Sequence, residues 1–125
     1  MISGFVRTIN SLADFIYAQN AHFWRDLNSG QALEDTPELL ASKIALMHSE
    51  LSETLEGLRK GEQDKHLPHR KAEEVELADL LIRALDYAGR RGFDIGGAMS
   101  EKMEYNRTRQ DHTDEARRAT GGKKF

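Results

Sequence analysis

The amino-acid sequence predicts an all-α fold built from four helices. Three long segments place apolar residues at the three- and four-residue spacing of an amphipathic helix, and turn-forming residues separate them. The hydrophobic fraction of 38% and the charged fraction of 31% are typical of a folded helical domain rather than of a disordered chain. A chain of 125 residues is long enough for one domain with a modest core.

The first helix is predicted to begin at Ser11, because Ser11 and Asp14 have the spacing of a capping box. Residues 1–10 show no clear apolar period, and we expect them to lead into this helix. Apolar residues at helical spacing continue as far as Leu27. The turn signal of residues 28–30, Asn-Ser-Gly, predicts the end of the helix there.

The second helix is predicted to open at Thr36-Pro37, with Thr36 as N-cap and Pro37 in the first turn. Gly61 is predicted to end it, and the polar segment 62–69 is expected to form a connecting loop. The buried stripe of this helix is predicted to contain six residues: Leu40, Ile44, Met47, Leu51, Leu55 and Leu58.

The third helix is predicted from about residue 71 to residue 91, with a stop at Gly92. Apolar residues cover more than half of its circumference, so we expect it to be central and also shared with another subunit. Asp94 is predicted to cap a fourth helix, which spans roughly residues 95–110. We expect one helical domain over residues 1–112 and a flexible, Gly-containing basic tail over residues 113–125.

Composition excludes several classes of protein. The chain has no cysteine, which excludes disulfides and thiolate metal sites. No apolar run is long enough to span a membrane, and no secretory signal pattern opens the chain, so we expect a cytoplasmic protein without a membrane partner. The net charge of −3 argues against nucleic acid as the main partner.

Two short acidic segments carry the main functional pattern. Glu50 and Glu53 lie three residues apart in the second helix, and Glu76 and Asp79 have the same spacing in the third. Residues at this spacing share a helix face, and the gap of 22 residues lets the chain turn and return antiparallel. Four carboxylates gathered between two helices need protons or cations. Mg²⁺ suits such an oxygen site and commonly takes substrate phosphates as its remaining ligands.

Polar groups on the fourth helix supply a second part of the pattern. Lys102, Asn106 and Arg109 share one face and offer the donors that a triphosphate needs. An isolated acidic pair on a helix is more often ordinary surface charge, so the combination carries more weight than either pair. Arg83 and Asp86 are expected either to form an ion pair within the third helix or to support the site.

Three aromatic side chains are candidates for contact with a nucleobase: His22, Trp24 and Tyr105. A lone tryptophan near the end of an amphipathic helix is more often a packing residue, and this alternative stays open for Trp24.

The acidic and polar motifs together resemble those of the MazG-like all-α nucleoside triphosphate pyrophosphohydrolases. The motifs that carry the resemblance are Glu50-x-x-Glu53, Glu76-x-x-Asp79 and Lys102-x-x-x-Asn106-x-x-Arg109. The resemblance covers roughly residues 36–110, and the closing segment 121–125 is similar to tails in some members. Ser49 stands where the family pattern often has a further glutamate.

The resemblance implies a MazG-like four-helix bundle that is completed by dimerisation, as a homodimer or a tetramer. It implies cleavage of a (deoxy)nucleoside triphosphate between the α and β phosphates, which yields the monophosphate and pyrophosphate. The implied ligands and catalytic residues for Mg²⁺, with Mn²⁺ as a possible substitute, are Glu50, Glu53, Glu76 and Asp79. The implied phosphate-binding residues are Lys102, Asn106 and Arg109.

Other functions compete with this interpretation. The same fold could act on dUTP or phosphoribosyl-ATP, or the chain could be a non-catalytic dimeric helical module that binds a partner. A di-iron carboxylate bundle requires Glu-x-x-His motifs, and none of the five histidines has a glutamate three residues before it. The sequence therefore argues against the di-iron alternative and leaves the others open.

Overall fold

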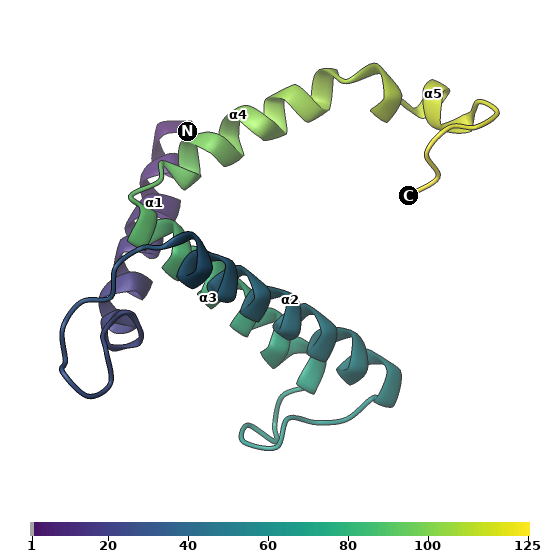
Figure 1. The fold of residues 1–125 in the computed structure, drawn as a ribbon. Helices are drawn as coiled ribbons and strands as arrows, with labels where there is room; N and C mark the ends of the chain where they lie inside the picture. Colours follow the sequence, from purple (N-terminus) through teal and green to yellow (C-terminus); the bar gives the residue numbers. More distant parts are fainter. Residues whose placement is uncertain (1) are drawn as a thin grey trace. The chain divides into compact units, whose positions relative to one another are not determined.

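The computed structural model describes residues 2–125, and this part of the chain is helical and contains no β-strand. Its α-helices are α1 (Ile2–Gln19), α2 (Pro37–Lys60), α3 (Ala72–Arg91), α4 (Ile95–Thr108) and α5 (Asp114–Arg118) (Figure 1). Single 3₁₀ turns cover Ala21–Trp24 and Gln110–His112. The prediction of an all-α fold is confirmed. None of the helices within residues 2–125 combines the length and the hydropathy of a membrane span.

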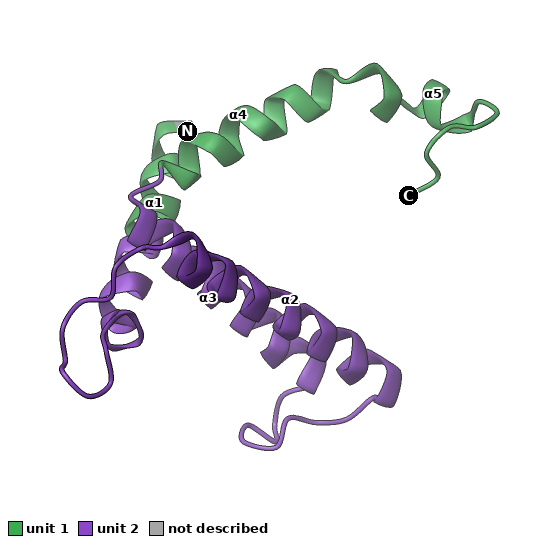
Figure 2. Ribbon diagram, in the orientation of Figure 1, with its two compact units in different colours: residues 1–11, 94–125 green, residues 12–93 purple. Residues whose placement is uncertain are grey.

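The chain divides into two compact units (Figure 2). The first unit contains the residues up to Ser11 together with residues 94–125, and the second contains residues 12–93. In the second unit, α2 and α3 run antiparallel and pack side by side along their lengths (Figure 1). This helix pair carries both acidic segments.

Local signals define the ends of α2 and α3, as predicted. The Thr36 hydroxyl accepts a hydrogen bond from the Leu39 N–H at 3.1 Å, which caps the start of α2. Gly61 ends α2 with a φ of 64°, and Gly92 ends α3 with a φ of 65°. Glycine adopts this left-handed conformation without the steric cost that other residues meet.

The start of α3 passes very close to α2. A Cβ atom at Gly57 would lie 2.7 Å from the backbone nitrogen of Glu73, so only glycine fits there. The connection before α3 is also ordered: the buried Asp64 carboxylate accepts hydrogen bonds from the His66 and Leu67 N–H groups at 2.8 and 2.7 Å. The Asp64 N–H donates to the Arg70 carbonyl at 2.9 Å. Together these contacts fix the register of α3 against α2.

The predicted bounds of the first helix are wrong at both ends. Helix α1 begins at Ile2 instead of Ser11, because contacts within the first unit stabilise its N-terminal half. The Asn10 side chain donates to Asp94 at 2.7 Å and accepts from the Gly96 N–H at 2.8 Å. At the other end, α1 stops at Gln19 instead of Leu27, and a 3₁₀ turn then buries Trp24 in the second unit.

The end of α4 lies close to the predicted residue 110, and the segment after it contains a short helix. Helix α4 ends at Thr108, and the short α5 forms within the segment that was predicted to be a tail. Asp111 accepts hydrogen bonds from Arg109 at 3.0 and 2.6 Å and from Lys123 at 2.9 Å. Arg117 donates to the carbonyls of Lys123 and Lys124 at 3.4 and 3.1 Å, so the last residues fold back on α5.

The second unit leaves much of its apolar surface uncovered. Leu51, Leu55 and Leu58 on α2 are 52% to 60% exposed. Leu77 and Leu81 on α3 are 45% and 56% exposed. Each of the two helices therefore presents leucines that the unit does not bury by itself.

Candidate functional site

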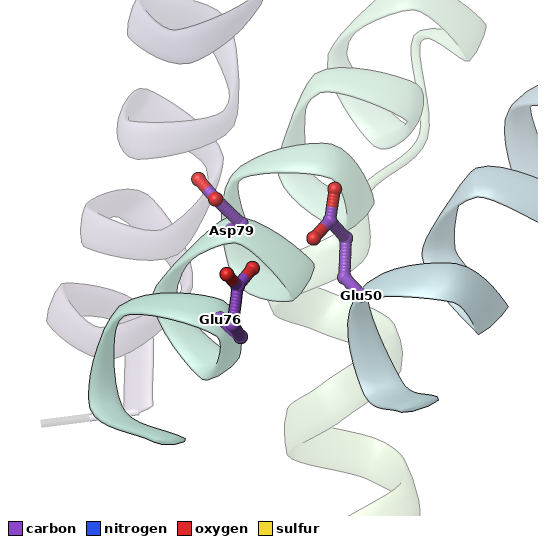
Figure 3. A group of neighbouring side chains, drawn as sticks. All are labelled: Glu50, Glu76 and Asp79. Carbon is purple, nitrogen blue, oxygen red and sulfur yellow. The ribbon is translucent and has the colours of Figure 1, made fainter. Parts of the chain in front are cut away.

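Three of the four predicted acidic residues meet between α2 and α3. Glu50 comes from α2, and Glu76 and Asp79 come from successive turns of α3 (Figure 3). One carboxylate oxygen from each residue lies within 4.8 Å of the other two. We call these three residues the carboxylate cluster. Glu53 is exposed and lies at its border, outside the 4.8 Å group.

Glu50 is the most deeply buried member of the cluster, with 6% of its surface exposed. The Arg83 Nε donates a hydrogen bond to its Oε1 at 2.7 Å. Burial raises the pKa of Glu50, but hydrogen bonding with Arg83, Glu53 and Glu76 lowers it by more, so the pKa falls below its ordinary value. Glu50 therefore stays ionised at neutral pH.

The pKa values of Glu76, Asp79 and Glu53 shift upward instead. Burial, followed by a hydrogen bond to Glu50 and the charges of the neighbouring acids, raises the pKa of Glu76 to about 7. Burial and the charge of Glu50 also raise the pKa of Asp79. Hydrogen bonding to Glu50, with burial and the charge of Glu50 added, raises the pKa of Glu53. The cluster thus holds more negative charge than Arg83 neutralises, and it retains a proton near neutral pH as a result.

These residues fit a hard divalent cation. All three members offer carboxylate oxygens, which are the ligands that Mg²⁺ prefers. Acidic residues on a helix surface are common without any ion, but they keep ordinary pKa values when water solvates them fully. In this cluster Glu50 is buried, whereas Glu76 and Asp79 are half-buried.

A cavity of about 550 Å³ adjoins the cluster in the second unit. Glu50, Asp79 and Arg83 contribute to its wall from α2 and α3. Phe23 and Ile82 supply apolar lining. A ligand in this cavity would therefore meet both the charged groups and an apolar surface.

Trp24 lies in the wall of the cavity and is only 1% exposed. Its indole Nε1 donates to both carboxylate oxygens of the buried Asp86, at 3.1 and 3.0 Å. The Lys43 Nζ lies 4.4 Å from the ring centroid, and the Arg90 Cζ lies 5.0 Å from it. These contacts give Trp24 and Asp86 a clear role in packing the second unit.

Phe23 is the most exposed of the aromatic residues that line the cavity, which also include Trp24 and Tyr87. It is 59% exposed and lines the cavity, and the His22 ring lies against it with the centroids 4.0 Å apart. Sequence reasoning singled out His22 and Trp24 and missed Phe23. The sequence signal for Phe23 was its place in a run of three aromatic residues, 22–24. The 3₁₀ turn decides which of the three rings is exposed, and the sequence patterns did not predict this turn.

Lys43 is a second residue that the sequence patterns did not indicate. It lines the cavity from α2, and its Nζ donates to the Phe23 carbonyl at 2.9 Å. Burial lowers the pKa of Lys43, and the positive charges of Arg83 and Arg90 add to this shift against the opposing charge of Asp86.

The predicted phosphate-binding residues and Tyr105 lie on or next to α4, in the first unit. The Lys102 Nζ lies 4.6 Å from the Tyr105 ring centroid. Arg109 is bound by Asp111 through two hydrogen bonds, which occupies its guanidinium. Asn106 is partly buried, and its Oδ1 has no hydrogen-bond partner within residues 2–125.

No family model matches the chain, and comparison with curated proteins and with solved structures also gives no match. The case for a function therefore depends on the chemistry of the cluster and the cavity.

Proposed function

We propose that the protein is a Mg²⁺-dependent nucleoside triphosphate pyrophosphohydrolase. It cleaves a (deoxy)nucleoside triphosphate between the α and β phosphates and releases the monophosphate and pyrophosphate. The observation that carries the proposal is the meeting of Glu50, Glu76 and Asp79 within 4.8 Å, beside a cavity of about 550 Å³. The excess negative charge of the cluster suits a divalent cation. The adjoining cavity has room for a phosphate-bearing substrate that such a cation could bind.

In this proposal, Glu50, Glu76 and Asp79 hold the ion. When bound, Mg²⁺ supplies a Lewis acid that neutralises phosphate charge and makes a water molecule more acidic. Glu50 is ready to act as a ligand because it is ionised, whereas Glu76 must give up its proton near neutral pH. Glu53, whose pKa is raised and which borders the cluster, is the residue that we assign to accept the proton of the attacking water.

The cavity is the proposed seat of the nucleoside. Its exposed Phe23 ring offers a stacking surface that any base can use, and Ile82 adds apolar contact. Lys102 and Asn106 on α4, and Arg109 directly after it, belong to the first unit, and their assignment to the phosphates rests on the sequence resemblance alone. For Arg109, this role requires release from Asp111.

A second copy of the chain is the proposed cover for the exposed leucines of α2 and α3. Two packed helices form a single layer, and a stable helical domain needs a further layer to bury such residues. Pairing of α2 and α3 with the same helices of another copy would complete a four-helix bundle, as a homodimer.

Pyrophosphate release from a nucleotide panel with Mg²⁺ tests the proposal, and the panel includes dUTP and phosphoribosyl-ATP. At least one triphosphate should be turned over, and Asp79→Asn should reduce the rate by more than about 100-fold because it removes a charged ligand. Asp14→Asn changes an exposed aspartate of α1 and serves as the matched control with an unchanged rate.

The same nucleotide panel distinguishes the proposed enzyme from a non-catalytic helical binding module. Folded protein that is incubated with Mg²⁺ and releases no pyrophosphate from any nucleotide would favour a helical binding module, for which the exposed leucines are the binding surface. Mg²⁺ should raise the melting temperature of the wild type and of Asp14→Asn, and it should have little effect on Asp79→Asn.

A further inference from the structure

One ion pair reaches the carboxylate cluster within the described part of the chain, and it joins Arg83 to Glu50. The two residues lie on different helices, and the Nε–Oε1 distance is 2.7 Å. The exposures of the partners differ: the Glu50 side chain is 9% exposed, whereas the Arg83 side chain is 40% exposed. Both residues line the cavity, and the guanidinium is the more exposed of the two groups.

Only one edge of the Arg83 guanidinium is occupied. Within residues 2–125, its Nε makes the bond to Glu50, and its Nη1 and Nη2 groups make no hydrogen bond to the protein. An arginine fork with two free nitrogens is a strong donor to phosphate, because parallel N–H groups match two phosphate oxygens.

A cation bound by the cluster would repel the positively charged guanidinium of Arg83. A divalent ion held by Glu50 and Asp79 brings two positive charges close to the guanidinium, which lies one turn beyond Asp79 on α3. Arg83 must then lose its hold on Glu50 or gain an anion as a new partner. The anion that accompanies the metal ion in the proposed reaction is the phosphate chain.

We infer that Arg83 is a phosphate-binding residue whose partner in the free protein is Glu50. It neutralises Glu50 when the site holds neither metal nor substrate, and it donates its Nη groups to the phosphates once both are bound. This inference rests on the proposed function. It gives the second unit a phosphate donor of its own, separate from the donors of α4.

A purely structural role for Arg83 makes the opposite prediction for metal binding. If Arg83 only orients Glu50 as a ligand, its removal should weaken binding of Mg²⁺ and of phosphate together. If Arg83 competes with the metal ion and then binds phosphate, its removal should change the two affinities in opposite directions.

The test measures Mg²⁺ binding without nucleotide, and then inorganic pyrophosphate binding at saturating Mg²⁺, by calorimetry. Arg83→Gln should bind Mg²⁺ alone about three- to tenfold more tightly, because a positive charge next to the site is removed. It should bind pyrophosphate at least about tenfold more weakly, because the fork is lost. Arg59→Gln removes an exposed arginine of α2 and is the matched control with both affinities unchanged.

Arg83→Lys gives an independent measurement if Arg83→Gln does not keep its helical circular dichroism spectrum. It retains the charge and loses the fork, so Mg²⁺ affinity should stay within about twofold and pyrophosphate affinity should fall about fivefold or more. Weaker Mg²⁺ binding in Arg83→Gln, or wild-type pyrophosphate affinity in either Arg83 variant, would overturn the inference.

The outcomes separate this inference from the proposed function. Wild-type protein that neither binds pyrophosphate with Mg²⁺ nor releases it from any nucleotide would overturn both. An active wild type with equal losses of Mg²⁺ and pyrophosphate affinity in Arg83→Gln would overturn the Arg83 assignment alone.

Discussion

Raising the pH from 5 to 8 should destabilise the metal-free protein through Glu76. Burial, the hydrogen bond to Glu50 and the neighbouring negative charges hold the pKa of Glu76 at about 7 in the folded protein, above its ordinary value of 4.5. Between these two values, the folded state keeps a proton that the unfolded state has released. The free energy of unfolding therefore falls as the pH rises through this window, and this effect ends above about pH 7.

The size of the effect follows from the shift. A carboxyl group that titrates at about 7 when folded and at 4.5 when unfolded loses at most about 2.5 kcal/mol between pH 5 and pH 8. Glu76 is only partly buried, so water screens its interactions, and we expect about 1 kcal/mol. For a chain of this length, that loss lowers the melting temperature by roughly 3–6 °C.

Urea denaturation at both pH values, with a chelator present, measures this effect. Glu76→Gln removes the titrating group. Between pH 5 and pH 8, the free energy of unfolding of this variant should therefore fall by about 1 kcal/mol less than that of the wild type. Glu101→Gln changes an exposed glutamate of α4 and should keep the wild-type pH dependence. Identical pH dependence in the wild type and Glu76→Gln would refute the reasoning.

Two further predictions concern packing in the second unit, and urea denaturation checks both. Gly57→Ala would place a Cβ 2.7 Å from the Glu73 nitrogen, so α2 and α3 must separate, at a cost of about 1–3 kcal/mol. Gly4→Ala fills open space on α1 and should be neutral or stabilising by up to about 1 kcal/mol; equal effects at both glycines would contradict the close approach. Trp24→Phe leaves the buried Asp86 without its indole donor and should cost about 2–3 kcal/mol, and a loss below about 1 kcal/mol would speak against this bond.

The bounds of α2 and α3 could be predicted from sequence because short-range chemistry sets them. The Thr36 cap and the glycine stops at Gly61 and Gly92 act through residues within one or two turns, and the structure confirms all three. The start of α1 could not be predicted in this way. It depends on contacts of Asn10 with Asp94 and Gly96, which lie more than 80 residues away in the chain.

Only the local part of the carboxylate cluster, within one helix, could be predicted from the sequence. Helical spacing indicated that Glu76 and Asp79 share a face, but it could not decide which acid of α2 faces them. The packing of α2 on α3 buries Glu50 and leaves Glu53 exposed, so Glu53 hydrogen-bonds to Glu50 but lies outside the group of three acids whose oxygens come within 4.8 Å.

The pairing of Arg83 could not be read from its own helix. Sequence spacing allowed a bond to Asp86, three residues further along α3. In the structure, Asp86 instead accepts a hydrogen bond from the Trp24 indole, and Arg83 donates to Glu50. Both partners come from other segments of the chain, and tertiary contacts decided the outcome.

The ordered connection between α2 and α3 has a consequence for how this chain can vary. Surface loops usually tolerate insertions and deletions, because little depends on their length. Here Asp64 accepts hydrogen bonds from two N–H groups of the connection, and the α3 backbone passes Gly57 too closely for a larger residue. An added residue would have to break the Asp64 turn or displace α3 along α2. Displacement of α3 would change how Glu76 and Asp79 face Glu50, so the length of this loop and the alignment of the acids are linked.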